Sequence, residues 1–249
     1  MLIHPEQPAC VLVEQFDLTT EAVHPLLAGV EDKLLSVLRW AREYLCRPHP
    51  ELGRKGPVCP FAQASLDRGM FYLAVHRGET VEPGALDELL MTYRDWFRQL
   101  PPTTGPAAQF KTILLTLPDV PQAEANAIVD ATQERLKPQY VAEGLMIGEF
   151  HSGPPDKAGL WNLDFRPLYS PVPLLAIRHM VSSDFPFLAD DPGSVATYLR
   201  LFGANTPPAL RSRVTAAANE FGLPAPHPAP VIPRPPVPQL ADQQGAAAS

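Results

Sequence analysis

The sequence predicts an α/β fold: a small, mostly parallel sheet of three or four strands with crossover helices, then a helical C-terminal portion and a disordered proline-rich tail. Segments with helical periodicity alternate with short apolar segments from residue 30 to residue 150. Strands that alternate with helices need crossover connections, which make neighbouring strands parallel. Hydrophobic residues form 45% of the 249-residue chain, which is enough for the core of one such domain.

The expected helices and strands follow one another in a regular order. Apolar residues recur at three- or four-residue steps over 30–46 and predict the first helix: Val30, Leu34, Leu38, Ala41 and Leu45. The other elements expected before the long loop are helices over 61–69, 83–100 and 121–137, and strands over 70–76, 110–117 and 145–150. A proline-rich loop over 151–173 comes next, and its length is typical of a functional segment. Three further helices are expected, over 173–181, 194–203 and 207–222.

We divide the chain into three parts. Residues 1–26 are an extended leader, in which residues 9–18 are a candidate edge strand. Residues 27–222 form a single α/β domain. Residues 223–249 carry proline at nearly alternate positions and cannot form a core, so we expect a disordered tail. The alternative for this tail is a ligand for a proline-recognising partner.

Composition and charge narrow the class of function. The net charge is −7 and no basic stripe is visible, so we expect no nucleic-acid partner. No apolar stretch is long enough to predict a membrane span, and the N-terminus lacks a signal-peptide pattern. The three cysteines are too few and too widely spaced for a disulfide framework. We therefore expect a cytoplasmic protein with a small-molecule substrate, with a homodimer left open.

Cys59 is the first candidate for chemistry. It stands in "GPVCPFA", where the following proline restricts it to an extended conformation. A helix expected to begin at Pro60 or Phe61 would stabilise a thiolate through its free amide groups and dipole. Cys59 is thus a candidate nucleophile, and a Cys-Pro pair is also a setting for haem ligation. The alternative is a small buried apolar residue.

His151 is the second candidate, because it directly follows the strand expected over 145–150. Ligands of α/β sheets bind at the carboxyl ends of the strands, so His151 is placed to ligate a metal or to transfer a proton. The alternative is a surface histidine that begins the loop. His76 also follows a strand, but Arg77 and Gly78 after it indicate a turn.

A third group of candidates lies around the motif "NLDFRPLYSPVPLLAIRHM". Arg166 and Arg178 flank a proline-rigid segment, in which Ser170 is predicted to cap a helix beginning near Pro171. A helix N-terminus with arginines nearby is a site for a carboxylate or a phosphate. His179 is a candidate axial ligand on another side of this helix, or else a solvent-facing residue, and Asn162 is a candidate pocket residue.

Several motifs of common enzyme classes are absent. The sequence contains no G-x-G-x-x-G, G-x-x-x-x-G-K-[ST], H-E-x-x-H or G-x-S-x-G motif. Dinucleotide-dependent redox, P-loop, zincin and α/β-hydrolase chemistry all lose support for this reason.

The motifs "CPFAQASLDRG", "GEFH" and "N-x-D-F-R-P-L-x-S-P-V-P-L-L-A-I-R-H-M" resemble an actinobacterial domain family of unknown function over roughly residues 30–190. A second uncharacterised bacterial family has a similar motif order. A more remote likeness is to the YqcI/YcgG family, in which a Cys-x-Phe motif also precedes a glycine and a strand. Some members of that family are haem proteins that oxygenate nitrogen in natural-product pathways.

The YqcI/YcgG resemblance implies a haem pocket near the carboxyl edge of the sheet. His151 or His179 would be the axial ligand of the metal, Arg166 or Arg178 would pair with propionates, and Cys59 would be structural or line the pocket. The resulting hypothesis is a haem-dependent oxygenase or related redox enzyme acting on a small amine or amino acid. The alternatives are an accessory protein that docks through its tail, and a cofactor-free enzyme with Cys59 as nucleophile and His151 as base.

Overall fold

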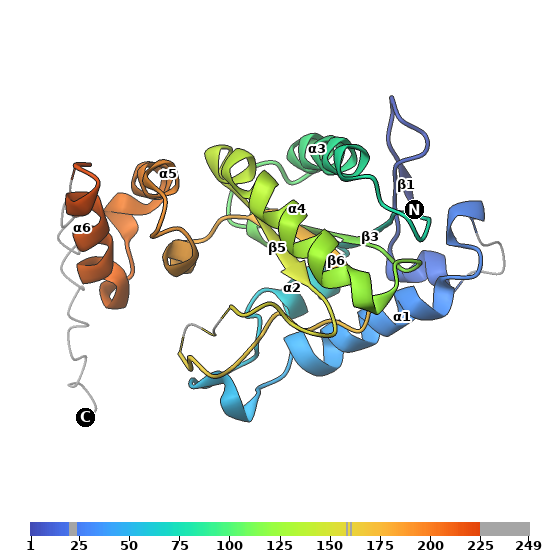
Figure 1. Ribbon diagram of the computed structural model, residues 1–249, viewed down its shortest axis with the longest axis horizontal. Coiled ribbons are helices and arrows are strands. Elements are labelled where there is room, and N and C mark those ends of the chain that lie inside the picture. The colour runs from blue at the N-terminus through green and yellow to red at the C-terminus, as the bar shows by residue number, and fades with distance from the viewer. Residues whose placement is uncertain (20–23, 158, 160, 225–249) are drawn as a thin grey trace, which may run out of the picture.

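The computed structural model describes residues 1–19, 24–157, 159 and 161–224. Its centre is a four-stranded sheet in the order β3–β4–β6–β5 (Figure 1). The strands of this sheet are Phe71–Val75 (β3), Thr112–Thr116 (β4), Leu145–Phe150 (β5) and Leu174–His179 (β6). Two short strands, Leu2–Ile3 (β1) and Val11–Leu12 (β2), pair with each other, and Val13 exchanges backbone hydrogen bonds with Leu73. Of the candidate edge strand over 9–18, only residues 11–13 are extended and paired, with Val13 beside β3, whereas Gln15–Leu18 forms a 3-10 turn.

Six α-helices accompany the sheet in the described part of the chain: Glu31–Trp40 (α1), Ala62–Asp67 (α2), Pro83–Gln99 (α3), Gln122–Ala142 (α4), Pro192–Phe202 (α5) and Arg211–Glu220 (α6). Helix α1 continues as a π-helical turn over Ala41–Leu45. Short 3-10 turns stand between these elements: Gln15–Leu18, Pro25–Leu27, Pro50–Leu52, Ala108–Phe110, Ser182–Phe187, Gly203–Asn205 and Pro208–Leu210. Each α-helix expected from the sequence is present except the one over 173–181.

The predicted α/β class is confirmed, with a mixed sheet. β3 and β4 are parallel neighbours, and α3 is the crossover between them. β6 lies between β4 and β5 and is antiparallel to both, so β3, β4 and β5 all run in one direction. The three strands joined through helices therefore run in one direction, as expected, but only β3 and β4 are parallel neighbours. The sheet is not mostly parallel, because β6 returns between β4 and β5 after the long loop.

The helix predicted over residues 173–181 is wrong, because this segment forms β6. Leu174 and Leu175 are both fully buried, and so is Ile177, because the two sides of this central strand face different apolar layers. Such a strand shows an almost continuous apolar run instead of an alternating one, which cannot be distinguished from a buried helix by periodicity. Ser170 therefore has no helix to cap at this position. Its hydroxyl donates instead to the carbonyl of Val172 at 2.7 Å.

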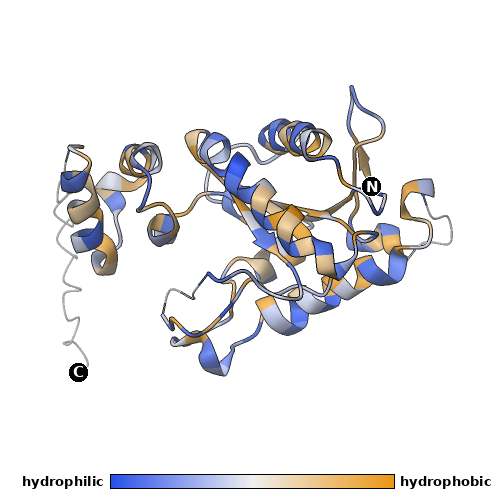
Figure 2. Cartoon of the chain, viewed as in Figure 1, coloured by the Kyte–Doolittle hydropathy of each residue, from blue (hydrophilic) through white to orange (hydrophobic). Residues whose placement is uncertain are grey.

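Helices α3 and α4 cover one face of the sheet (Figure 1). Leu90, Tyr93 and Phe97 of α3 pack with Ile113 and Leu115 of β4 in a continuous buried cluster. The helix α4, expected to end at 137, continues through Pro138 to Ala142, where the Tyr140 hydroxyl donates to the Leu90 carbonyl at 2.7 Å. Figure 2 shows hydrophilic and hydrophobic residues on both helices, and the buried residues of α3 recur at three- and four-residue steps, as expected for a helix with one buried face.

The opposite face of the sheet is covered unevenly. Helix α1 packs on β3 and its neighbours through Leu34, Val37 and Leu38. The half of this face formed by β5 and β6 has no long helix over it among the described elements, and the loop over 151–173 runs on this side (Figure 1). This unevenness creates the candidate site described below.

The C-terminal helices α5 and α6 form a separate apolar cluster with Met146, Met180 and Phe185. No helix within the described ranges combines the length and apolar composition needed to cross a membrane. The tail predicted to be disordered lies, from residue 225 onward, outside the described residues.

Candidate functional site

A cavity of about 500 Å³ lies on the α1 side of the sheet, and we call it the sheet-face cavity. Its floor includes Leu114, Ala176 and Gly148, which stand side by side on β4, β6 and β5. Ala176 and Gly148 leave the sheet surface low at this point because their side chains are small or absent. The cavity is thus encoded by two small residues in the middle of two strands.

The walls of the sheet-face cavity are mainly apolar and rich in aromatic rings. The apolar lining residues are Trp40, Leu45, Phe61, Phe71, Phe110, Met146, Phe150, Leu163, Leu168, Pro186 and Phe187. They come from α1, the start of α2, the sheet, the long loop and the turn after β6. Such walls favour a ligand with an apolar body, and the volume is in the range of small-molecule sites.

Arg178 brings a positive charge onto the sheet side of the cavity. On β6 it stands between Thr112 of β4 and Met146 of β5. Its guanidinium donates two hydrogen bonds of 2.7 Å to the carboxylate of Asp184, which is only 4% exposed. Burial lowers the pKa of Arg178, but the charges of Asp184 and Cys59 raise it by more. Arg178 is therefore a fixed cation at the cavity wall.

Cys59 also lines the sheet-face cavity and is half-buried. Its backbone amide donates to the carbonyl of Leu45 at 2.8 Å, which ties the segment before α2 to the end of the first helix. The helix α2 begins at Ala62 and has six residues, so it is later and shorter than expected. Arg178 lines the same cavity, and the charge of Cys59 is one of the causes that raise the pKa of Arg178.

A second polar group lies where the edge strand β5 meets α4. Lys157 of the long loop pairs with the buried carboxylate of Glu149 and donates to Gln133 at 3.1 Å. Gln133 in turn donates to the Ile147 carbonyl of β5 at 3.1 Å. All three residues line the cavity, and Lys137 lies beside them. This group was not predicted from the sequence, although a glutamate inside the apolar strand "LMIGEF" indicates a paired carboxylate.

His151 does follow β5, as expected, but it does not line the cavity. The ring is 1% exposed, and its Nε2 lies 3.0 Å from an Asp130 carboxylate oxygen of α4. Its Nδ1 has no hydrogen-bond partner among the described residues. No hydrogen bond joins His151 to Cys59 in this part of the chain, so the proposed base and nucleophile are not brought into one contact.

His179 lies on the opposite face of the sheet from Arg178, because consecutive strand residues point to opposite sides. The centroid of its ring lies 4.9 Å from that of the Phe97 ring. The ring also borders a separate hollow, together with Arg98 and Glu143. Burial, together with the charge of nearby Lys111, lowers the pKa of His179 to about 4. The expectation that His179 and Arg178 share one helix is wrong.

Arg166 and Asn162 hold the long loop in place. Arg166 pairs with the exposed Asp156 and donates to the Leu163 carbonyl at 2.7 Å. The Asn162 side chain donates to the Glu51 carbonyl at 2.8 Å. Neither residue is among the described residues that line the cavity. Both instead anchor the loop beside it.

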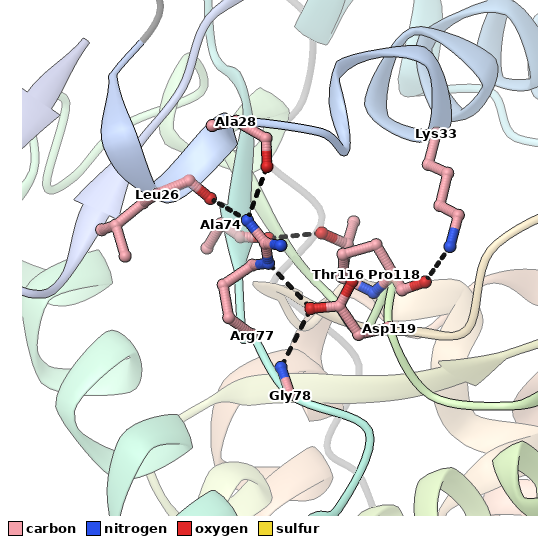
Figure 3. Close-up of polar contacts among 9 residues, drawn as sticks. All are labelled: Leu26, Ala28, Lys33, Ala74, Arg77, Gly78, Thr116, Pro118 and Asp119. Carbon is pink, nitrogen blue, oxygen red and sulfur yellow. Dashed lines mark hydrogen bonds and ion pairs between the residues drawn. The ribbon is translucent and has the colours of Figure 1, made fainter.

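The carboxyl ends of β3 and β4, where the sequence favours a ligand, are closed by a hydrogen-bond network (Figure 3). Asp119 accepts from the Arg77 guanidinium at 2.7 Å and from the Gly78 amide at 2.9 Å. Arg77 also donates to the carbonyls of Leu26 and Ala28, at 3.1 and 3.0 Å. This network joins the leader to the sheet.

No cluster of three or more histidine, cysteine or carboxylate side chains suited to a metal ion occurs within the described ranges. The candidate metal ligand His151 has one carboxylate neighbour, Asp130.

The fold and the cavity define the class: an α/β domain with a mixed sheet and a small-molecule-sized pocket on one sheet face. The chain belongs to the family described as "Domain of unknown function (DUF6875)", whose model matches residues 34–213. This range covers all four strands of the main sheet and every segment that lines the cavity. No curated protein and no solved structure matches the chain.

Proposed function

We propose that this chain is a small-molecule enzyme domain whose ligand is an amphipathic acid bound in the sheet-face cavity. The observation that carries the proposal is the cavity itself, whose lining combines aromatic walls with the thiol of Cys59 and the guanidinium of Arg178. An apolar ligand body would lie between the rings, and its acidic group would pair with a cation of the lining.

The charges of the lining favour an acid over an amine. Five cationic side chains line the cavity: Lys111, Lys137, Lys157, Arg178 and Arg213. Two acidic side chains, Glu149 and Asp190, line it as well, and Lys157 already pairs with Glu149. Within the described residues Arg213 makes no ion pair, so it is free to receive a carboxylate at the cavity rim.

Haem is the specific member of this ligand class that the motif resemblance to the YqcI/YcgG proteins supports. It has a flat apolar ring with two carboxylates, and when bound it supplies oxygen chemistry. Of the described residues on the lining, Cys59 and Met146 are of types that ligate haem iron, and none is a histidine. The haem-dependent oxygenase hypothesis therefore stands with Cys59 in place of His151 or His179 as the ligand.

The protein's own residues have clear tasks in this proposal. The Arg178 guanidinium is held by Asp184 and by the His179 carbonyl, and it receives an acidic group at its remaining N–H groups. The Lys157–Glu149 pair holds the long loop over the cavity, and this loop excludes water from the bound molecule.

The test is an absorbance spectrum of protein purified from haem-replete cells, together with haem titrations of variants. We expect a saturable Soret band, which Cys59→Ser shifts or abolishes and which His151→Ala and His179→Ala leave in place. A band lost in either histidine variant, with the fold intact by circular dichroism, contradicts the Cys59 assignment. A colourless protein that binds no haem in the titration would rule out haem as the ligand. The wider proposal of an amphipathic acid is tested separately below.

Thiol chemistry without a cofactor is the second candidate, and the position of Cys59 and Arg178 on the lining of one cavity favours it. We expect iodoacetamide to alkylate Cys59 faster than a model thiol near neutral pH, and Arg178→Gln to slow the reaction. Cys10, which is buried in the other apolar cluster, is the internal control. A rate for Cys59 at or below that of the model thiol would argue against this candidate.

A further inference from the structure

Cys46 and Cys59 lie next to each other beside the cavity, although they are 13 positions apart in the sequence. The segments that carry them run antiparallel, with Pro48 paired with Pro57 in an isolated bridge. One residue further along, the Val58 amide donates to the Arg47 carbonyl at 2.9 Å. Cys46 and Cys59 come directly after this pair, where the register shifts and the Cys59 amide donates to the carbonyl of Leu45.

The backbone limits the distance between these two cysteines. The Cys59 amide donates at 2.8 Å to the carbonyl of Leu45, which belongs to the peptide bond that continues into Cys46. Standard bond lengths then place the two Cα atoms within roughly 6.5 Å of each other. Disulfides bridge Cα atoms that are about 4.4–6.8 Å apart, so the backbone is already positioned for a bond.

The two thiols share one environment. Both are free and half-buried, and both pack against the apolar cluster of α1 and β3. Burial raises the pKa of Cys46, and the charge on Cys59 raises it further, as expected for neighbouring groups. Cys10 differs from them, because it is buried beside Tyr93 in the cluster on the opposite face.

We propose that Cys46 and Cys59 are a reversible disulfide pair that low-molecular-weight disulfides, such as glutathione disulfide, oxidise. One cysteine thiolate attacks the glutathione disulfide and releases one glutathione thiolate. The second cysteine thiolate attacks the protein sulfur of this mixed disulfide and expels the second glutathione. Two protein thiols are thereby oxidised to one disulfide, and one glutathione disulfide is reduced to two glutathione molecules.

The consequence for the cavity rests on the proposed function. Cys59 lines the cavity as a thiol, and a bond to Cys46 removes that thiol from any ligand or substrate. Oxidation therefore switches off haem ligation or thiol chemistry, and reduction restores it. Formation of the disulfide does not require a bound ligand. The disulfide proposal and the proposed function can therefore be refuted independently of each other.

The test treats the native, full-length protein with glutathione disulfide and counts free thiols. We expect the count to fall from three to one, with a mass lower by two hydrogen atoms and full recovery in dithiothreitol. Trypsin cleaves after Arg42, Arg54 and Lys55, so the two cysteines fall in different peptides, 43–54 and 56–68. These peptides are expected to run as one linked species before reduction and as two after it.

Matched variants locate the bond. Cys46→Ser and Cys59→Ser are each expected to abolish the linked peptide, whereas Cys10→Ser keeps it. A thiol count that stays at three in the folded protein, while the urea-unfolded chain oxidises, would overturn the proposal. So would stable glutathione adducts on both cysteines without any linked peptide. Neither result depends on whether the cavity binds a ligand.

Discussion

The two faces of the sheet differ in how completely they are filled. On the α3–α4 face, Leu90, Tyr93 and Phe97 are buried with strand residues in one continuous apolar cluster. On the α1 face, helices cover β3, but Gly148 and Ala176 leave a hollow over β5 and β6. The difference separates two tasks: one face holds the fold together, and the other keeps a space open for a ligand.

The largest expected effect comes from truncating matched phenylalanines on the two faces. Phe97→Ala is expected to lower the free energy of unfolding by about 3–5 kcal/mol, because it leaves a cavity in a filled core. Phe110→Ala is expected to cost about 0.5–2 kcal/mol, because its ring already borders the sheet-face cavity. Urea denaturation of both variants measures the difference. Equal costs would show that the two faces are packed alike.

The reverse substitution enlarges a small residue on each face. Ala74→Leu is expected to destabilise the fold by about 1–3 kcal/mol, because Ala74 is fully buried in the filled core. Ala176→Leu is expected to change the stability by less than about 1 kcal/mol, because the added side chain enters the sheet-face cavity. Thermal denaturation compares the pair. A loss in Ala176→Leu as large as that in Ala74→Leu contradicts an open cavity.

The ion pairs on the cavity side differ in burial, and their effects should differ accordingly. Asp184→Asn is expected to cost about 1.5–3 kcal/mol, because the nearly buried carboxylate accepts two charged hydrogen bonds from Arg178. Asp156→Asn is expected to cost less than about 0.5 kcal/mol, because its carboxylate is 90% exposed. Chemical denaturation of both variants provides the check, and equal losses would contradict it.

The smallest expected effect is a pH dependence of the stability, which comes from His179 on the α3–α4 face. The pKa of His179 is lowered to about 4 in the folded chain, below the ordinary value of 6.5. The unfolded chain therefore takes up a proton first, and stability falls as the pH drops from about 6.5 to about 4. His179→Phe is expected to flatten this slope, while His76, whose pKa burial also lowers, keeps part of it. Identical slopes in the variant and the wild type would refute the assignment.

The sequence predicted the elements whose patterns are local. The amphipathic helices α1 and α3 follow from periodicity, and α4 and the strands β3, β4 and β5 follow from composition and from the turns that separate them. β6 was missed because both of its sides are buried, so that its pattern does not alternate. That single error also placed Arg178 and His179 on one helix, although they face opposite sides of the sheet.

The site was predicted only in part, because a cavity depends on contacts between distant segments. Cys59 and Arg178 were singled out and do share the sheet-face cavity. Glu149 and Lys157 were not, because their pairing requires the long loop to fold back on β5. The low floor at Gly148 and Ala176 is visible only once the register of the strands is known.

The central claim is that the sheet-face cavity binds an amphipathic acid, and its most direct test uses 8-anilinonaphthalene-1-sulfonate, an aromatic anion. The measurement is a fluorescence titration of the native wild type, of Ala176→Leu, which fills the cavity, and of Arg178→Gln, which removes its fixed cation. We expect one saturable site in the wild type. In both variants we expect the affinity of this site to be at least tenfold lower, which corresponds to a loss of binding free energy of about 1.4 kcal/mol or more. Absence of a saturable site, or equal affinity in all three proteins, would contradict the claim.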